Sequence, residues 1–252
     1  LWNYRELFAM LAWRDILVRY KQTVVGVAWS VIRPLLSMIV FTVVFGKIAG
    51  LPSDNVPYVL MVFAGMLPWQ FFSNTLTTGS ESLIGSQALI SKVYFPRLII
   101  PTSRIVISLI ELAISALIFV PLFFWYRYVP SWQIVFLPFF VILVSAISLG
   151  ITFIIAALNV KYRDFRYIVP FMVQFGMYVS PVGFSSAVIP AKWQFWYQLN
   201  PMVGVIDGIR WSLFNSPVSV QAVVISVVAS AALMVAGFCF FRQMETEFAD
   251  YI

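Results

Sequence analysis

Stretches that contain no charged side chain, each long enough to cross a bilayer, constrain this chain more than any other feature. They cover residues 55–80, 128–160, 167–191 and 211–241. A membrane-spanning helix needs about 20 consecutive, mostly apolar residues, and all four stretches exceed that length. Repetition on this scale is typical of a multi-pass membrane protein.

Two further apolar stretches contain charges. Residues 27–45 carry Arg33 near their start, and residues 98–125 contain Arg104 and Glu111. With these two, the sequence predicts six transmembrane helices. We expect an all-α integral membrane protein, because lipid tolerates only helices or closed barrels and the alternating polarity of barrel strands is absent.

The composition indicates the same class. Apolar residues make up 62% of the 252 residues, whereas they make up about 45–50% of an ordinary soluble domain. A single soluble core of this size could not hide so much apolar surface.

The basic residues are distributed unevenly over the two sides that six spans would create. One side holds ten of them: Arg5, Arg14, Arg19, Lys21, Lys92, Arg97, Lys161, Arg163, Arg166 and Arg242. The other side holds four: Lys47, Arg127, Lys192 and Arg210. The positive-inside rule therefore places the N- and C-termini in the cytoplasm. This bias also explains the net charge of +6 without a nucleic-acid partner.

We expect residues 1–252 to form one membrane domain. It consists of a cytoplasmic interface helix in residues 1–25, a six-span bundle in residues 27–241 and a cytoplasmic tail in residues 242–252. The predicted interface helix carries an apolar stripe formed by Tyr4, Leu7, Leu11 and Val18, which Arg14 and Asp15 interrupt. Residues 184–217 are apolar, aromatic and broken by prolines, which predicts external re-entrant helices before the last span.

The chain lacks the residues that most catalytic and metal sites use. It contains no histidine, and its one cysteine, Cys239, lies in an apolar run. The pair Gly46-Lys47 is followed by Ile48, and Phe41 stands where a nucleotide-binding P-loop has its first glycine. Nine of the ten carboxylates are scattered outside the spans. We therefore expect no enzymatic activity, no metal site, no cofactor and no ATP site in this chain.

Three charged residues in or near the predicted spans each allow two interpretations. Arg104 and Glu111 are seven residues apart and share a helix face. A charge inside a membrane is a functional hypothesis by default, but Arg104 could also reach the interface while Glu111 pairs with a neighbouring helix. Arg33 could likewise be an interfacial arginine, or it could contact a diphosphate, because its guanidinium offers a bidentate fork to phosphate oxygens.

Six segments carry a resemblance to a known family. They are RYKQTVVGVAWSVIRPLL (19–36), FAGMLPWQFFSN (63–74), LISKVYFPRLIIP (89–101), AALNVKYRDFRYIVPF (156–171), LNPMVGVIDGIRWSLF (199–214) and FRQMETEFADYI (241–252). In this order, and along nearly the whole chain, they resemble the type-2 ABC transporter permeases that export polysaccharides. The O-antigen exporter permeases are most similar, and the capsule and teichoic acid exporters are near relatives.

The resemblance implies a homodimeric, channel-forming permease of the bacterial inner membrane, driven by two separate cytoplasmic ATPase subunits. Its substrate would be a polysaccharide linked to a polyprenyl diphosphate, used in lipopolysaccharide biosynthesis and moved from the cytoplasm to the outer face of that membrane. The resemblance also implies a cytoplasmic coupling helix in residues 80–95. There we expect the ATPase contact to involve Leu83, Ile84, Ser86, Leu89 and Ile90, although a solvated connector is the alternative.

The aromatic residues suggest a path for the sugar, because sugar rings stack on aromatic faces. Phe171, Phe175 and Tyr178 share one helix face beside Gln174. Met38, Phe41 and Phe45 form a similar stripe in the first span, and the two stripes could face each other across a dimer axis. The alternative for each ring is ordinary packing between helices.

Two other functions remain open at the level of sequence. One is a type-2 ABC permease for a drug or another small amphiphile. The other is a membrane-embedded glycosyl- or phosphotransferase, which the absence of histidine and of clustered carboxylates disfavours.

Overall fold

The computed structural model describes residues 4–20, 26–53, 56–93, 95–162 and 164–248, and every regular element within them is a helix. Some of the predictions fall outside these ranges. They concern Lys21 and Arg163 among the cytoplasmic basic residues, residues 1–3 and 21–25 of the interface helix, and residues 249–252 of the tail.

Five helical segments in the described part of the chain are long and apolar enough to cross a membrane: Ala28–Ile48, Tyr58–Ser80, Ile99–Tyr126, Trp132–Lys161 and Val220–Met244. Two of them are single helices, α3 (Tyr58–Ser80) and α12 (Val220–Met244). The other three combine α2 (Gly26–Phe41) with the π-helix η2 (Thr42–Ile48), α6 (Ile99–Ala116) with α7 (Phe119–Tyr126), and the 3₁₀ helix η3 (Trp132–Phe136) with α8 (Leu137–Lys161). The structure therefore confirms the all-helical membrane fold class.

The predicted span over residues 167–191 is shorter in the structure. Helix α9 (Phe165–Val179) has 15 residues, which corresponds to about 22 Å at 1.5 Å per residue and is less than the bilayer core of about 30 Å. It ends because Pro181 disfavours helical backbone at Ser180, which is extended at φ −96° and ψ 153°. The predicted count of six spans is therefore not confirmed.

The last span is preceded by a separate helix. Residues 201–214 form a separate helix, α11 (Pro201–Phe214), which ends at Asn215 in the left-handed conformation (φ 55°). The span α12 begins only at Val220, where the side chain of Ser219 accepts a hydrogen bond from the backbone N–H of Ala222 (3.4 Å). The uncharged stretch over residues 211–241 therefore includes the end of α11 and the turn after it, and the span begins just beyond the predicted external segment of residues 184–217.

Helix α3 is the most buried of the five spans. In its most apolar stretch, 78% of the residues are buried, compared with 11–39% in the other four spans. Helices α8 and α12 approach each other very closely, because an added Cβ at Gly237 would lie 2.2 Å from the carbonyl oxygen of Gly150. Small residues of this kind let two membrane helices come into backbone contact.

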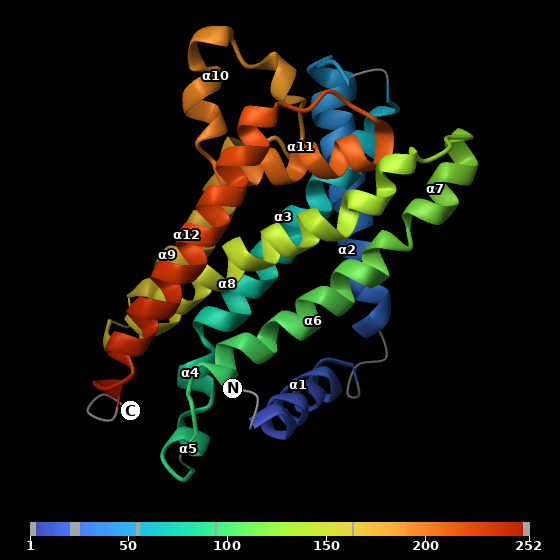
Figure 1. The fold of residues 1–252 in the computed structure, drawn as a ribbon. Coiled ribbons are helices and arrows are strands. Elements are labelled where there is room, and N and C mark those ends of the chain that lie inside the picture. Colours follow the sequence, from blue (N-terminus) through green and yellow to red (C-terminus); the bar gives the residue numbers. More distant parts are fainter. Residues whose placement is uncertain (1–3, 21–25, 54–55, 94, 163, 249–252) are drawn as a thin grey trace.

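The non-spanning helices lie at two opposite ends of the bundle (Figure 1). One end holds α1 (Arg5–Tyr20), the short helices α4 (Ser82–Gly85) and α5 (Gln87–Ile90), and the end of α12. The other end holds α10 (Ala191–Gln198) and α11. Helix α1 forms within the predicted interface segment, but Val18 points outward while Asp15 is buried, so the predicted apolar stripe is only partly correct.

Candidate functional site

Two ion pairs join α1 to α6. Arg104 Nη1 lies 2.9 Å from Asp15 Oδ2, and Arg19 pairs with Glu111. Asp15 and Arg19 are four residues apart on α1, so both point toward the same helix. The hypothesis that Glu111 pairs with a neighbouring helix is confirmed. Arg104 also finds a partner within the protein, and its side chain is only 21% exposed.

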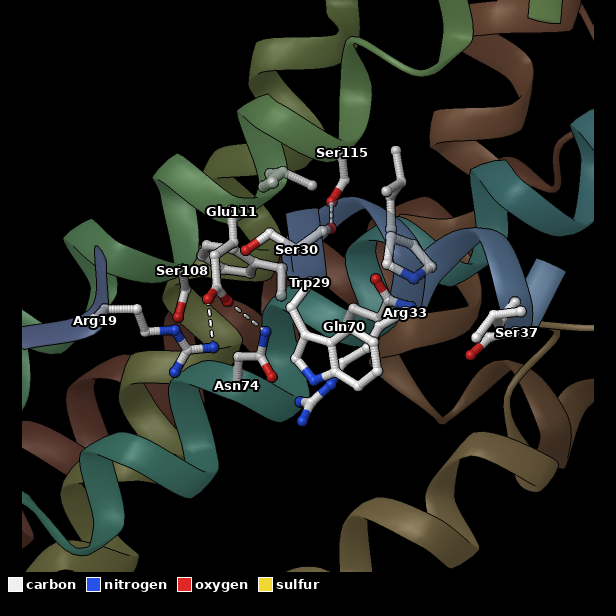
Figure 2. A pocket seen from close by; sticks show the side chains of 15 residues that line it. Arg19, Trp29, Ser30, Arg33, Ser37, Gln70, Asn74, Ser108, Glu111 and Ser115 are labelled. Carbon is white, nitrogen blue, oxygen red and sulfur yellow. Dashed lines mark hydrogen bonds and ion pairs between the residues drawn. The ribbon is translucent and has the colours of Figure 1, made fainter. Parts of the chain in front are cut away.

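A polar cavity of about 590 Å³ opens between α1, α2, α3 and α6. Its charged lining residues are Arg19, Arg33 and Glu111, and serine hydroxyls and the amides of Gln70 and Asn74 complete its polar wall. Figure 2 shows the carboxylate of Glu111 between Arg19 and Asn74. The amide nitrogen of Asn74 donates a hydrogen bond to Glu111 Oε2 at 2.7 Å. The cavity therefore combines two cations with one anion that is already paired.

Arg33 lines this cavity from α2. Its guanidinium carbon lies 5.8 Å from the centroid of the Trp29 ring, and it forms no ion pair with any residue that the structure describes. The side chain is exposed. The contact of Arg33 with a diphosphate stays a prediction, and the position suits it because the guanidinium is accessible from a polar cavity.

A second cavity, of about 400 Å³, lies between α2, α3 and α9. It brings together Phe41 and Gln174, two residues of the predicted sugar path, with Trp69 and Met177 in the same wall. Aromatic rings beside an amide suit sugar rings, which have apolar faces and hydrogen-bonding rims.

The other residues of the predicted sugar path lie elsewhere. Met38 is buried in the core, and the Phe45 ring contacts the Phe41 ring in a tilted arrangement, with 5.4 Å between centroids and 38° between planes. On α9, Phe171 and Phe175 stack at 5.9 Å with their planes 11° apart. These two rings and Tyr178 are exposed on a face of α9 that does not line the cavity. Their role in a sugar path stays a prediction.

A polar stripe on α3 connects the two cavities. Gln70 and Asn74 line both of them, and Ser73 and Thr77 continue the stripe in the second cavity. Sequence reasoning missed this feature, although its signal is visible: the four polar residues are spaced i, i+3, i+4 and i+7, so they share one helix face inside an uncharged span.

The residues of the predicted coupling segment differ in how deeply they are buried. Leu83 is fully buried (0% exposed) and Ser86 is also buried, so both contact the protein's own interior. Ile84 is exposed, and Leu89 and Ile90 are half-buried. The ATPase contact stays a prediction, and the accessible apolar surface for it comes from Ile84 and α5.

The predicted external segment contains a buried charge cluster. Arg210 of α11 is only 2% exposed, and its guanidinium donates to the backbone carbonyls of Met61, Val182 and Phe184 at 3.0–3.2 Å. Asp207 lies 3.7 Å from it. The sequence groups Arg210 with the basic residues of the side opposite the termini, and the structure shows that this side chain is buried rather than exposed. Nearby, burial, followed by the negative charge of Asp207, raises the pKa of Tyr197 above its ordinary value of 10.0.

Metal ligands do not gather anywhere in the part of the chain that the structure describes. No group of three or more histidine, cysteine, aspartate or glutamate side chains lies close enough there to hold an ion. The chemistry of both cavities is therefore that of guanidinium, carboxylate, amide, hydroxyl and aromatic groups.

Known proteins are similar to this chain along nearly its whole length. The O-antigen export system permease protein RfbA of Myxococcus xanthus is 28% identical over 255 residues, covering 100% of this chain and 97% of the relative. Two proteins of the same name from Klebsiella pneumoniae are each 26% identical, covering 98% of this chain and 95% of each relative. A protein family described as "ABC-2 type transporter" matches residues 6–214, which include every residue that lines the two cavities.

Proposed function

Because this chain belongs to the ABC-2 type transporter family, we propose that it is the permease subunit of an ATP-driven exporter of polysaccharide linked to a polyprenyl diphosphate. The chain is a multi-pass protein of the bacterial inner membrane, as its family and its five candidate spans indicate. It carries the glycolipid from the cytoplasm to the outer face of that membrane. The full-length similarity to O-antigen export permeases supports this choice of cargo.

The observation that carries the proposal is the polar stripe of α3 and the two cavities that share it. A lipid-linked glycan presents an anionic diphosphate next to neutral sugar rings. The first cavity offers the guanidinium of Arg33, and the second offers Phe41, Trp69 and Gln174. The two kinds of surface thus adjoin each other, as the two parts of this substrate do.

The proposed topology has six membrane crossings and both termini in the cytoplasm. The sixth crossing is α9, extended by the buried segment from Ser180 to Ser185. The end of the bundle with α1, α4 and α5 is the cytoplasmic one, because most of the basic residues outside the spans gather there. The burial of Arg210 supports this orientation, since it leaves three basic residues on the external surface instead of four.

The partners follow from the same proposal. Two copies of the permease form a channel, and two ATPase subunits bind on the cytoplasmic side at α4 and α5. Energy comes from these subunits, because the permease sequence carries no P-loop. The exposed Ile84 and the half-buried Leu89 and Ile90 supply the apolar part of the contact.

Reconstitution of the permease with its ATPase in proteoliposomes tests this function. Lipid-linked polysaccharide is expected to increase ATP hydrolysis and to reach the opposite leaflet only when ATP is supplied. An ATPase subunit that binds but cannot hydrolyse ATP is the control. Equal stimulation by a small amphiphile would favour a drug permease, and glycolipid synthesis without any ATPase would show a membrane-embedded transferase.

A further inference from the structure

Glu111 is the acidic residue that lines the first cavity. Arg19 and Arg33 are the two basic residues that line it. The carboxylate of Glu111 pairs with Arg19 of α1 and accepts a hydrogen bond from Asn74 of α3. Glu111 is 8% exposed, whereas the Arg19 side chain is 39% exposed, so the carboxylate is buried and the guanidinium is accessible from outside. Arg33, in the same cavity, lies near the Trp29 ring and forms no ion pair within the described part of the chain.

A carboxylate and a phosphate are interchangeable partners for arginine. Both offer two oxygens to the planar fork of the guanidinium, and both bonds are charge-assisted. The phosphate carries more charge, and a diphosphate has enough oxygens to engage two arginines at once. A diphosphate that enters the cavity and binds Arg33 is therefore a direct competitor of Glu111 for Arg19.

We propose that Glu111 is a built-in counter-ion that a phosphate group displaces from Arg19 when the lipid diphosphate binds. In the structure the carboxylate neutralises Arg19. In the bound state the diphosphate bridges Arg19 and Arg33, and the amide of Asn74 keeps the released carboxylate hydrogen-bonded. This inference rests on the proposed function for the identity of the lipid, and it adds a role for Glu111.

This exchange of partners at Arg19, from the carboxylate of Glu111 to a phosphate, limits how tightly the diphosphate binds. The released carboxylate stays close to the phosphate, and the two negative charges repel each other because the Glu111 side chain is buried. Binding therefore costs the ion pair between Arg19 and Glu111 and adds a like-charge contact. A transporter benefits from this arrangement, because a substrate held by two arginines without an opposing charge would leave slowly.

The exchange predicts opposite effects from the two partners of one ion pair. Farnesyl diphosphate, a short polyprenyl diphosphate, is titrated into the detergent-purified permease. Glu111→Gln keeps an oxygen that can accept from Asn74 but removes the competing charge, so affinity is expected to rise about tenfold. Arg19→Gln is expected to lower affinity about tenfold. In the Arg19→Gln background Glu111→Gln should raise affinity by less than tenfold, because only the like-charge repulsion is removed and no ion pair with Arg19 is left to compete.

A purely structural ion pair gives a different pattern. Both single variants would then loosen the contact between α1 and α6, and neither would bind the probe more tightly than the unmodified protein. Unchanged or weaker binding by Glu111→Gln overturns the proposal. Glu111→Asp provides a second variant that retains the charge but shortens the side chain, and a smaller increase in affinity is expected from it.

Glu6→Gln is the matched control for net charge. Glu6 is exposed in the first turn of α1 and does not line the cavity, so its substitution should leave the affinity unchanged. Inorganic diphosphate and phosphatidylglycerol vesicles identify the source of the ligand. The same variant pattern with farnesyl diphosphate alone indicates a lipid diphosphate, and the same pattern with inorganic diphosphate indicates a free anion.

The result is separable from the test of the proposed function. If the unmodified permease exports lipid-linked polysaccharide while Glu111→Gln leaves the affinity for farnesyl diphosphate unchanged, the exchange is wrong and the transport function stands. If the affinity pattern is found but no glycolipid is exported, the exchange holds and the proposed cargo is wrong.

Discussion

Arg210 of α11 donates a hydrogen bond from Nη2 to the backbone carbonyl of Val182, 3.1 Å away, and so ties α11 to the loop that follows α9. The same guanidinium reaches Met61 of α3 and Phe184 of the loop. An added Cβ at Gly65 would lie only 2.7 Å from Arg210 Nη2, so a glycine on α3 makes room for it. One buried side chain thus joins three parts of the end of the bundle that carries α10.

Substitution of Arg210 is expected to destabilise the protein strongly. Arg210→Gln removes the cation beside Asp207 and the guanidinium donor to three carbonyls, and removing one partner of a buried pair costs about 3–5 kcal/mol. Thermal unfolding in detergent should show a clearly lower midpoint. Lys192→Gln, on the exposed surface of α10, is the control and should leave the midpoint nearly unchanged. Equal midpoints for the two variants would contradict the role of Arg210.

The pair formed by Asp15 and Arg104 is expected to hold α1 against α6. A double-mutant cycle with Asp15→Asn and Arg104→Gln measures this contact, and residues in one salt bridge show interaction energies of about 0.5–3 kcal/mol. Each single variant should lower the unfolding midpoint, because Asp15→Asn leaves Arg104 without this carboxylate and Arg104→Gln leaves the buried Asp15 with Arg14 as its ion-pair partner. The double variant should lose less stability than the sum of the losses of the two single variants. Strict additivity would mean that the two side chains do not interact.

Hydropathy located the spans well wherever they are bounded by charges or prolines. The predicted stretches 55–80 and 128–160 match the observed Tyr58–Ser80 and Trp132–Lys161 within a few residues. The boundaries of these spans could be predicted because a charged residue ends each stretch. The early end of α9 also has a local signal, the pair Ser180-Pro181, but the uncharged sequence beyond it conceals the break.

Burial of charge could not be predicted in the same way. The partners of Arg210 are mainly backbone carbonyls from residues far away in the sequence, and carbonyls are present at every position. Asp15 and Glu111 likewise each have an ion-pair partner on another helix, Arg104 and Arg19 respectively, in addition to Arg14 for Asp15 and Asn74 for Glu111. Composition indicates that a membrane charge has a partner, whereas only the three-dimensional arrangement identifies it.

The close contact between α8 and α12 predicts a sharp effect of a small substitution. Gly237→Ala would place a methyl group 2.2 Å from the carbonyl oxygen of Gly150, so the helices must separate. Overpacking of this kind costs about 1–3 kcal/mol. Gly85→Ala is the control, because an added Cβ there meets nothing within 4 Å. We expect less folded protein on size-exclusion chromatography for Gly237→Ala only, and equal yields would contradict the contact.

The proposed topology predicts opposite labelling of two single cysteines. Ala88 on α5 and Ala187 in the external segment are both exposed, whereas Ser86 is buried and unsuited to labelling. After Cys239→Ala, a membrane-impermeant maleimide added to intact cells should label Ala187→Cys. Ala88→Cys should react only after the inner membrane is opened. Labelling of both positions in intact cells would exclude the six-crossing arrangement.

The exposed aromatic rings of α9 are expected to act in transport rather than in folding. Phe175 and Tyr178 are 59% and 57% exposed, so removing their rings leaves little cavity in the protomer. The double variant Phe175→Ala/Tyr178→Ala should therefore retain a normal unfolding midpoint and normal basal ATP hydrolysis with the ATPase. Export of glycolipid should fall, because stacking on aromatic rings contributes about 1–3 kcal/mol per ring for bases and is lost at two positions at once.

Two control variants separate this expectation from packing. Phe153→Ala removes a ring from the core, where Phe153 is 1% exposed, and should cost about 3–5 kcal/mol of stability. Phe124→Ala removes a ring that is 80% exposed on α7, outside the proposed path, and should change neither stability nor export. Aggregation of the α9 double variant, or its dissociation into monomers, would assign its rings to packing within or between protomers. Unchanged export would remove them from the sugar path, because a ring that guides the glycan must slow its passage when it is lost.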